Sequence, residues 1–154
     1  AVLALSEGKI KDANNYIEKY RSVSNENSVS EVDISTGLAE VYSKAGIFDK
    51  AEEYYRRALS SETENPIRIS NLAYFLIDKD RNIKEGMELI DKALELNSDN
   101  YSYLHIKGWG FYKQGDYEEA LELLNKSWEL KPVYDHELYL HLDEVKKAVI
   151  TRTR

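Results

Sequence analysis

Small residues recur along this chain at intervals of 34 or 35 residues, in three parallel series. The nine positions are Ala51, Gly86 and Ala120 in one series, Ala58, Ala93 and Ser127 in the second, and Ala39, Ala73 and Gly108 in the third. One extra residue, inserted in the second unit, explains why each series has one interval of 34 residues and one of 35. The polar segment 78–82 is the place where this extra residue fits. A repeat of this length is a supersecondary unit that cannot bury its apolar face alone, so neighbouring units must stack.

Each repeat predicts two helices joined by a short turn. In the third unit, apolar residues at helical spacing predict helices over residues 101–114 and 117–130. Residues typical of helix N-caps stand where helices are expected to begin. These predicted caps are Ser30, Asn65, Asn82 and Asp116. Two antiparallel helices approach closely only where side chains are small, which is the role that we assign to the three series.

The bulk composition excludes several classes of function. The 154 residues include 21 basic and 28 acidic side chains, a net charge of −7, whereas nucleic-acid binding requires clustered Lys and Arg. Without cysteine, the chain forms no disulfide or thiolate metal site. No apolar run approaches the roughly 18 residues of a membrane helix, so membrane insertion is not expected. Because the chain starts without Met inside a predicted helix, we interpret it as a fragment of a longer protein, and its compartment is not predicted.

Nothing in the sequence predicts catalysis. His136 and His141 are five residues apart, which on a helix turns them about 140° from each other, and His105 is distant in sequence. Paired carboxylates such as Glu118 and Glu119 fall at a predicted helix start, where the helix dipole favours negative charge. The chain also contains no glycine-rich phosphate loop and no nucleophile elbow. We therefore expect no enzyme, no metal site and no cofactor.

The repeat resembles the tetratricopeptide repeat (TPR) family. The third unit carries the pattern best, through Leu104, Gly108, Phe111, Gly115, Tyr117, Ala120, Leu124, Ser127 and Pro132. The resemblance implies an all-α fold, a right-handed solenoid of antiparallel helix pairs that ends in a capping helix. Within one domain of 1–154, the expected parts are a partial unit at 1–22, full units at 32–64, 66–99 and 101–132, and the capping helix at 135–149. The partial unit departs from the pattern, with Tyr20 where a small residue is expected. The second and third units resemble those of bacterial members.

In this family, the first helix of each unit lines a concave surface on which members usually bind peptides. Counting along the repeat places several aromatic residues on that surface. Aromatic side chains are favoured contact anchors because they bury much area at little entropic cost. We therefore expect a non-catalytic protein–protein interaction module that holds a peptide or helix of a partner. Its expected binding residues are Ser70, Asn71, Tyr74, His105, Trp109, Tyr112 and Tyr139.

An alternative is that these rings pack on neighbouring helices and complete the core. Trp109 is the sharpest case, because Gly108 and Gly110 flank it and glycine is unfavourable inside a helix. Close packing explains Gly108. Gly110 is explained either by an open surface beside Trp109 or by crowding from the next helix.

Some family members grip a peptide's C-terminal carboxylate with a set of Lys, Arg and Asn side chains. Here only Asn71 fits such a position, and Asp33 and Glu40 would face an anionic ligand without a basic partner, so we exclude that specificity. A second class of function also stays open. The repeats could be a structural spacer, an oligomerising element, or an accessory domain of a larger exported or enzymatic protein, and the chain could be a monomer or a weak homodimer.

Overall fold

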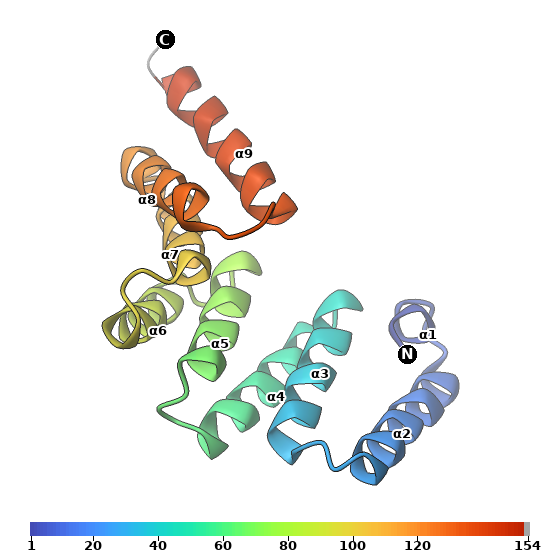
Figure 1. Ribbon diagram of the computed structural model, residues 1–154. Coiled ribbons are helices and arrows are strands. Elements are labelled where there is room, and N and C mark those ends of the chain that lie inside the picture. The colour runs from blue at the N-terminus through green and yellow to red at the C-terminus, as the bar shows by residue number, and fades with distance from the viewer. Residues whose placement is uncertain (153–154) are drawn as a thin grey trace. The chain divides into compact units, whose positions relative to one another are not determined.

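The computed structural model describes residues 1–152, with every side chain in that range except that of Ile10. Over this range the chain forms helices joined by short connections, without a strand, which confirms the all-α prediction (Figure 1). The helices are α1 (Val2–Ser6), α2 (Ile10–Glu26), α3 (Glu31–Lys44), α4 (Phe48–Ser61), α5 (Pro66–Asp78), α6 (Ile83–Leu96), α7 (Tyr101–Gln114), α8 (Tyr117–Leu130) and α9 (His136–Arg152). The two helices predicted in the third unit have the predicted bounds.

Helix capping follows the sequence at three of the four predicted positions. The side chain of Ser30 accepts a hydrogen bond from the Asp33 amide at 3.1 Å, and Asn65 and Asn82 cap α5 and α6 in the same way. Asp116 is the N-cap residue of α8, as predicted, but its side chain makes no capping hydrogen bond. Its backbone carbonyl accepts from the Ala120 amide at 3.0 Å.

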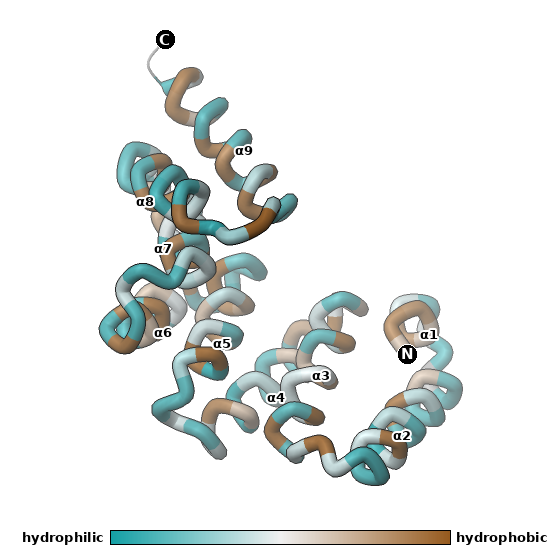
Figure 2. Tube along the Cα trace, viewed as in Figure 1, coloured by the Kyte–Doolittle hydropathy of each residue, from teal (hydrophilic) through white to brown (hydrophobic). Residues whose placement is uncertain are grey.

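Two further caps were not predicted. Asn100 accepts from two amides at the start of α7, and Asp135 accepts from the Leu138 amide at the start of α9. The helices are therefore delimited mainly by local side chains. Figure 2 shows hydrophobic and hydrophilic residues alternating along the helices, as expected where each buries one face.

The chain divides into two compact units, Ala1–Arg68 and Ile69–Arg154, and the division falls inside α5. The expectation of a single domain stays a prediction. In the first unit, α3 and α4 form an antiparallel pair around buried apolar residues. These residues are Ile34, Leu38, Ala39, Tyr42, Ala51 and Ala58. Helix α2 continues to Glu26, beyond the residue 22 at which the partial unit was expected to end.

In the second unit, the small-residue positions are places of close helix contact. A Cβ added to Gly86 of α6 would lie 2.6 Å from Ile77 and 3.0 Å from the carbonyl oxygen of Ala73, both in α5. A Cβ added to Gly108 of α7 would lie 3.0 Å from Leu124 of α8. Separations this short mean that a larger side chain would require the neighbouring atoms to shift. The series therefore has the packing role that the sequence predicts.

Helix α9 covers the last helix pair. It packs on α8 and α7 through a cluster of buried residues. The cluster consists of Ala120, Leu124, Leu138, Leu142 and Val145. This arrangement agrees with the expected C-terminal capping helix, and it brings α9 beside α7, where several of the candidate binding residues lie.

Candidate functional site

Four of the predicted binding residues line one pocket in the second unit, and they come from α5 and α7. They are Ser70, Asn71, Tyr74 and His105, and the pocket is completed by Ser102, Ile106 and Glu137. Its volume is about 130 Å³. Residues of α5 and α7 spaced by three or four positions share a helix face, so the helical period places their side chains together. Glu137 comes from α9 and was not among the predicted residues.

Tyr74 closes one side of this pocket. Its hydroxyl donates a hydrogen bond to the carboxylate of Glu137, and its ring lies 6.5 Å from that of His105, measured between centroids. Burial, the hydrogen bond to Glu137 and nearby carboxylates raise the pKa of Tyr74 above its ordinary value. The phenol therefore stays protonated and acts as a donor at neutral pH.

His105, which is buried, and His141, which is partly buried, form a hydrogen-bonded pair that the sequence analysis did not anticipate. His105 Nε2 lies 2.8 Å from His141 Nδ1, so one ring donates to the other, and His105 is only 5% exposed. Burial and the second ring lower the pKa of His105 to about 4, and burial also lowers that of His141. Both imidazoles are consequently neutral at neutral pH, and the floor of the pocket carries no positive charge there.

Trp109 lies in a stack of rings beside the pocket. Its ring is parallel to that of His141, at 3.6 Å between centroids, and it stacks on Tyr112 at 4.7 Å. The indole Nε1 donates to Asp78 at 3.2 Å, and Trp109 is only 5% exposed. For Trp109, the alternative of core packing describes the structure.

Gly110 is explained by crowding. A Cβ at this position would lie 2.2 Å from the sulfur of Met87 in α6 and 3.3 Å from Ile77 in α5. The alternative of an open surface beside Trp109 is wrong. The crowding comes from the two preceding helices, whereas the sequence analysis placed it in the next one. Glycine at this position lets the side chain of Met87 in α6 lie directly against α7.

The last two predicted residues lie in different surroundings. Tyr112 is partly exposed, and its hydroxyl donates to Glu144 of α9 at 2.8 Å. Tyr139 does not join the pocket. It is 46% exposed and packs near Trp128 and Tyr134, where it lines a separate pocket of about 340 Å³ between α8 and α9.

A repeat-length separation would have indicated several of these contacts. Three side-chain hydrogen bonds join α5, α7 and α9, and their partners are 31 to 36 residues apart, about one repeat. They link Trp109 to Asp78, Tyr112 to Glu144 and His105 to His141. Residues one repeat apart occupy similar positions on successive first helices, so such pairs meet when those helices lie side by side. His105 and His141 fit this rule.

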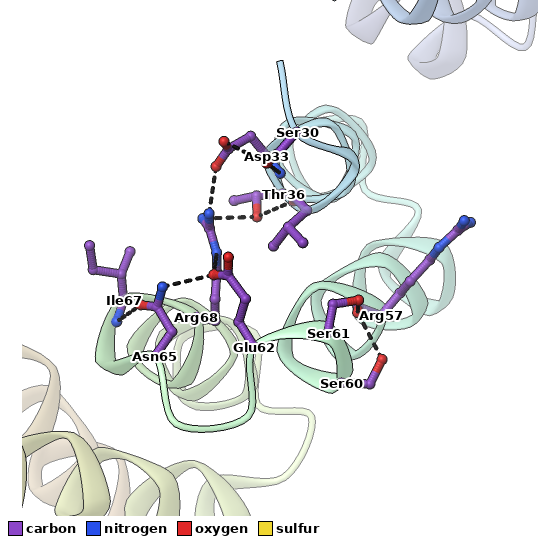
Figure 3. Close-up of polar contacts among 11 residues, drawn as sticks. Ser30, Asp33, Thr36, Arg57, Ser60, Ser61, Glu62, Asn65, Ile67 and Arg68 are labelled. Carbon is purple, nitrogen blue, oxygen red and sulfur yellow. Dashed lines mark hydrogen bonds and ion pairs between the residues drawn. The ribbon is translucent and has the colours of Figure 1, made fainter. Parts of the chain in front are cut away.

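In the first unit, Asp33 has a basic partner, which corrects the sequence analysis. The guanidinium of Arg68 pairs with Asp33 and, through Nε at 3.0 Å, with Glu62 (Figure 3). The hydrogen bond from Ser30, followed by that from Arg68, lowers the pKa of Asp33. Arg68 is occupied by two carboxylates, so it neutralises acidic groups of its own chain.

Within residues 1–152, no group of three or more His, Cys, Asp or Glu side chains is placed to hold a metal ion. Across the same part of the chain, none of the helices has the length and apolar character required to span a bilayer.

Two segments match models of the tetratricopeptide repeat, residues 36–68 and residues 101–134. A TPR repeat-containing protein of Methanocaldococcus jannaschii is 34% identical over 107 residues, which is 70% of this chain and 18% of that protein. Another from Pseudomonas aeruginosa is 35% identical over 93 residues, 60% of this chain and 15% of that protein. The chain thus spans less than a fifth of the length of these relatives.

Solved structures of TPR domains share the fold. The TPR domain of Sgt2 from Aspergillus fumigatus matches with a TM-score of 0.69 at 21% identity, over 80% of this chain and 82% of that one. The first TPR domain of Spaghetti (RPAP3), bound to the HSP90 peptide SRMEEVD, matches with a TM-score of 0.64 at 19% identity, over 78% of this chain and 94% of that one. The repeat models, the named relatives and the shared fold lead to one conclusion: this chain belongs to the tetratricopeptide repeat family.

Proposed function

We propose that the chain is a non-catalytic protein–protein interaction module that holds a peptide segment of a partner against α5, α7 and α9. The observation that carries this proposal is the pocket to which three helices contribute polar and aromatic side chains. A TPR domain of the same fold is solved with a peptide bound, which supports the proposal by analogy.

In this proposal, some of the predicted residues contact the peptide directly, and others hold the floor of the pocket in place. Asn71 and Tyr74 are partly exposed, and the amide of Asn71 can both donate to and accept from a peptide backbone. Ser70 and His105 are buried and would form the floor. Trp109 has little exposed surface, so in this proposal it holds the floor in place through His141, while Tyr112 offers its accessible ring to the partner.

Peptide capture tests the proposal. A display library of random linear peptides would be panned against the parent chain, an Asn71→Ala/Tyr74→Ala variant and a Tyr139→Ala control. Tyr139 is also an exposed aromatic residue of the second unit, but it lies outside the pocket. We expect the parent and the control to enrich the same peptides and the pocket variant to lose them. Equal enrichment by all three folded proteins would contradict binding at this pocket.

A second candidate function is self-association, and a separate observation favours it. Several exposed apolar residues lie close together in the sequence, from the end of α8 into the first part of α9. They are Leu130, Val133, Tyr134, Tyr139 and Leu140. Sedimentation equilibrium over a range of concentrations tests this candidate, with a Tyr139→Lys variant as the comparison. A dimer that the variant abolishes would support the oligomerising role, and a monomer at all concentrations would exclude it.

A further inference from the structure

The pocket of Ser70, Asn71, Tyr74, Ser102, His105, Ile106 and Glu137 also has a definite charge. Glu137 is exposed at the pocket, and its ionised carboxylate accepts one hydrogen bond from Tyr74. A carboxylate has about four acceptor sites, so Glu137 retains capacity for a second donor. Asp78 and Asp135 add to the negative potential. Each of them raises the pKa of Tyr74 and also raises that of His105, against the effect of burial.

A lysine balances Asp78 but not Glu137, since Lys79 pairs with Asp78 at 2.7 Å. No Lys or Arg is among the described residues that line the pocket. The nearby lysines of α7 and α9 are paired elsewhere, Lys107 with Asp91, Lys113 with Asp80 and Lys147 with Asp143. The two histidines are neutral at pH 7. The pocket therefore presents a carboxylate to a ligand without a cation beside it.

The size of the pocket limits what it can hold. Pockets for small molecules usually measure about 300–1,000 Å³, whereas this one measures about 130 Å³. One side chain of a peptide is the appropriate occupant. The rings of Tyr74 and His105 offer an apolar wall for an aliphatic stem, and Asn71 and Ser102 supply neutral acceptors near Glu137.

We propose that this pocket receives the ammonium or guanidinium group of a Lys or Arg side chain in the partner peptide, and that Glu137 is its counter-charge. The inference rests on the proposed function, because it names the side chain that the peptide-binding site selects. It also predicts that acidic peptides such as the SRMEEVD segment bound by Spaghetti are poor ligands for this site, since their Glu and Asp side chains would meet Glu137.

An oriented peptide library tests the inference directly. Four immobilised mixtures of random peptides would be identical except at one central position, which is fixed as Lys, Arg, norleucine or Glu. The parent chain is expected to bind the Lys and Arg mixtures about tenfold more strongly than the norleucine mixture, and the Glu mixture least. Binding to none of the mixtures would contradict the proposed function. Equal binding to all four would leave the proposed function standing and overturn this inference.

Substitutions assign the preference to one carboxylate. Glu137→Gln keeps the shape of the side chain and an acceptor for Tyr74, but it removes the charge. This variant is expected to bind the Lys mixture no more strongly than the norleucine mixture. Glu144→Gln is the matched control, since Glu144 is an exposed residue of the same helix that accepts from a tyrosine hydroxyl, that of Tyr112, outside the pocket. It should keep the full preference.

A charge reversal completes the test. Glu137→Lys should reverse the order, so that the Glu mixture binds more strongly than the Lys mixture. Circular dichroism would confirm that each variant is folded. Retention of the Lys preference by folded Glu137→Gln, or its loss in Glu144→Gln, would overturn the assignment of Glu137.

Discussion

The Nε2 atom of His105 and the Nδ1 atom of His141 lie 2.8 Å apart and join α7 to α9. This hydrogen bond requires at least one neutral ring, because two imidazolium groups carry no acceptor. His105 lines the candidate peptide pocket, and His141 stacks on the ring of Trp109. One contact between α7 and α9 thus depends on the protonation state of two residues about one repeat apart.

The stability of the second unit should consequently depend on pH. The pKa of His105 in the folded chain is about 4, below the ordinary value of 6.5, and that of His141 is also lowered. Between about pH 4 and pH 6.5, His105 therefore binds more protons in the unfolded chain than in the folded chain. The contribution of the pair is therefore complete above pH 6.5 and is lost as the pH falls towards about 4.

Urea unfolding at pH 7.5 and pH 5.0 measures this effect. The parent chain should lose more stability between the two pH values than a His105→Gln/His141→Gln variant. His136→Gln is the control, since His136 is an exposed residue that contacts Tyr134. It should lose as much stability as the parent does. An equal loss in the parent and the double variant would show that the histidine pair does not cause the pH dependence.

Trp109 should behave as a core residue. Removal of a buried tryptophan ring costs about 3–5 kcal/mol of stability, so Trp109→Ala should approach that range. Trp109→Phe should cost less, because it keeps a ring in the stack but loses the hydrogen bond to Asp78. Tyr139→Ala, at an exposed ring, should stay within about 1 kcal/mol of the parent. Chemical denaturation distinguishes these values, and a Trp109→Ala protein as stable as Tyr139→Ala would refute the core role.

The glycines at the helix contacts should differ in their tolerance of alanine. Gly86→Ala brings a methyl group against Ile77 and against the backbone oxygen of Ala73, which cannot move alone, so it should cost about 1–3 kcal/mol. Gly110→Ala meets mainly the flexible side chain of Met87. Both changes gain about 1 kcal/mol of helix propensity. The net cost of Gly110→Ala should therefore be the smaller one, because a side chain moves more easily than a backbone oxygen. Thermal unfolding of the two variants ranks them, and a more severe effect of Gly110→Ala would contradict this reasoning.

Tyr20 and Gly37 should be energetically coupled in the first unit. A Cβ at Gly37 of α3 would lie 2.3 Å from the hydroxyl oxygen of Tyr20 in α2. The side chain of Tyr20 therefore occupies the space that a side chain at position 37 would need. Gly37→Ala should destabilise the parent, and the same change should cost less when Tyr20→Phe removes the hydroxyl.

A double-mutant cycle measures this coupling, which for residues in contact is about 0.5 kcal/mol or more. Glycine to alanine at position 37 also changes helix propensity, but that effect is the same in both backgrounds and cancels in the cycle. Additive effects of Gly37→Ala and Tyr20→Phe would mean that the tyrosine ring moves aside without cost.

Local and periodic features of the fold were readable from the sequence. The 34- or 35-residue interval of small residues predicted the helix pairs, and the positions of Ser30, Asn65 and Asn82 predicted where helices begin. Capping and helical periodicity depend on residues within one or two turns, so they are encoded locally. Asp116 stands at the predicted N-cap position of α8, although its side chain makes no capping hydrogen bond.

Contacts between repeats were decided by the tertiary structure. Counting along the repeat placed Ser70, Asn71, Tyr74 and His105 on one surface, and they do line one pocket. The same counting could not show that Trp109 is covered by His141 or that Tyr139 packs towards Trp128. It also missed Arg68 beside Asp33 and Glu137 beside Tyr74. These contacts depend on how far one helix rotates and shifts against another, which is set by the packing of many side chains together. The sequence by itself determined the repeat and its helices, and tertiary packing determined which side chains a partner can reach.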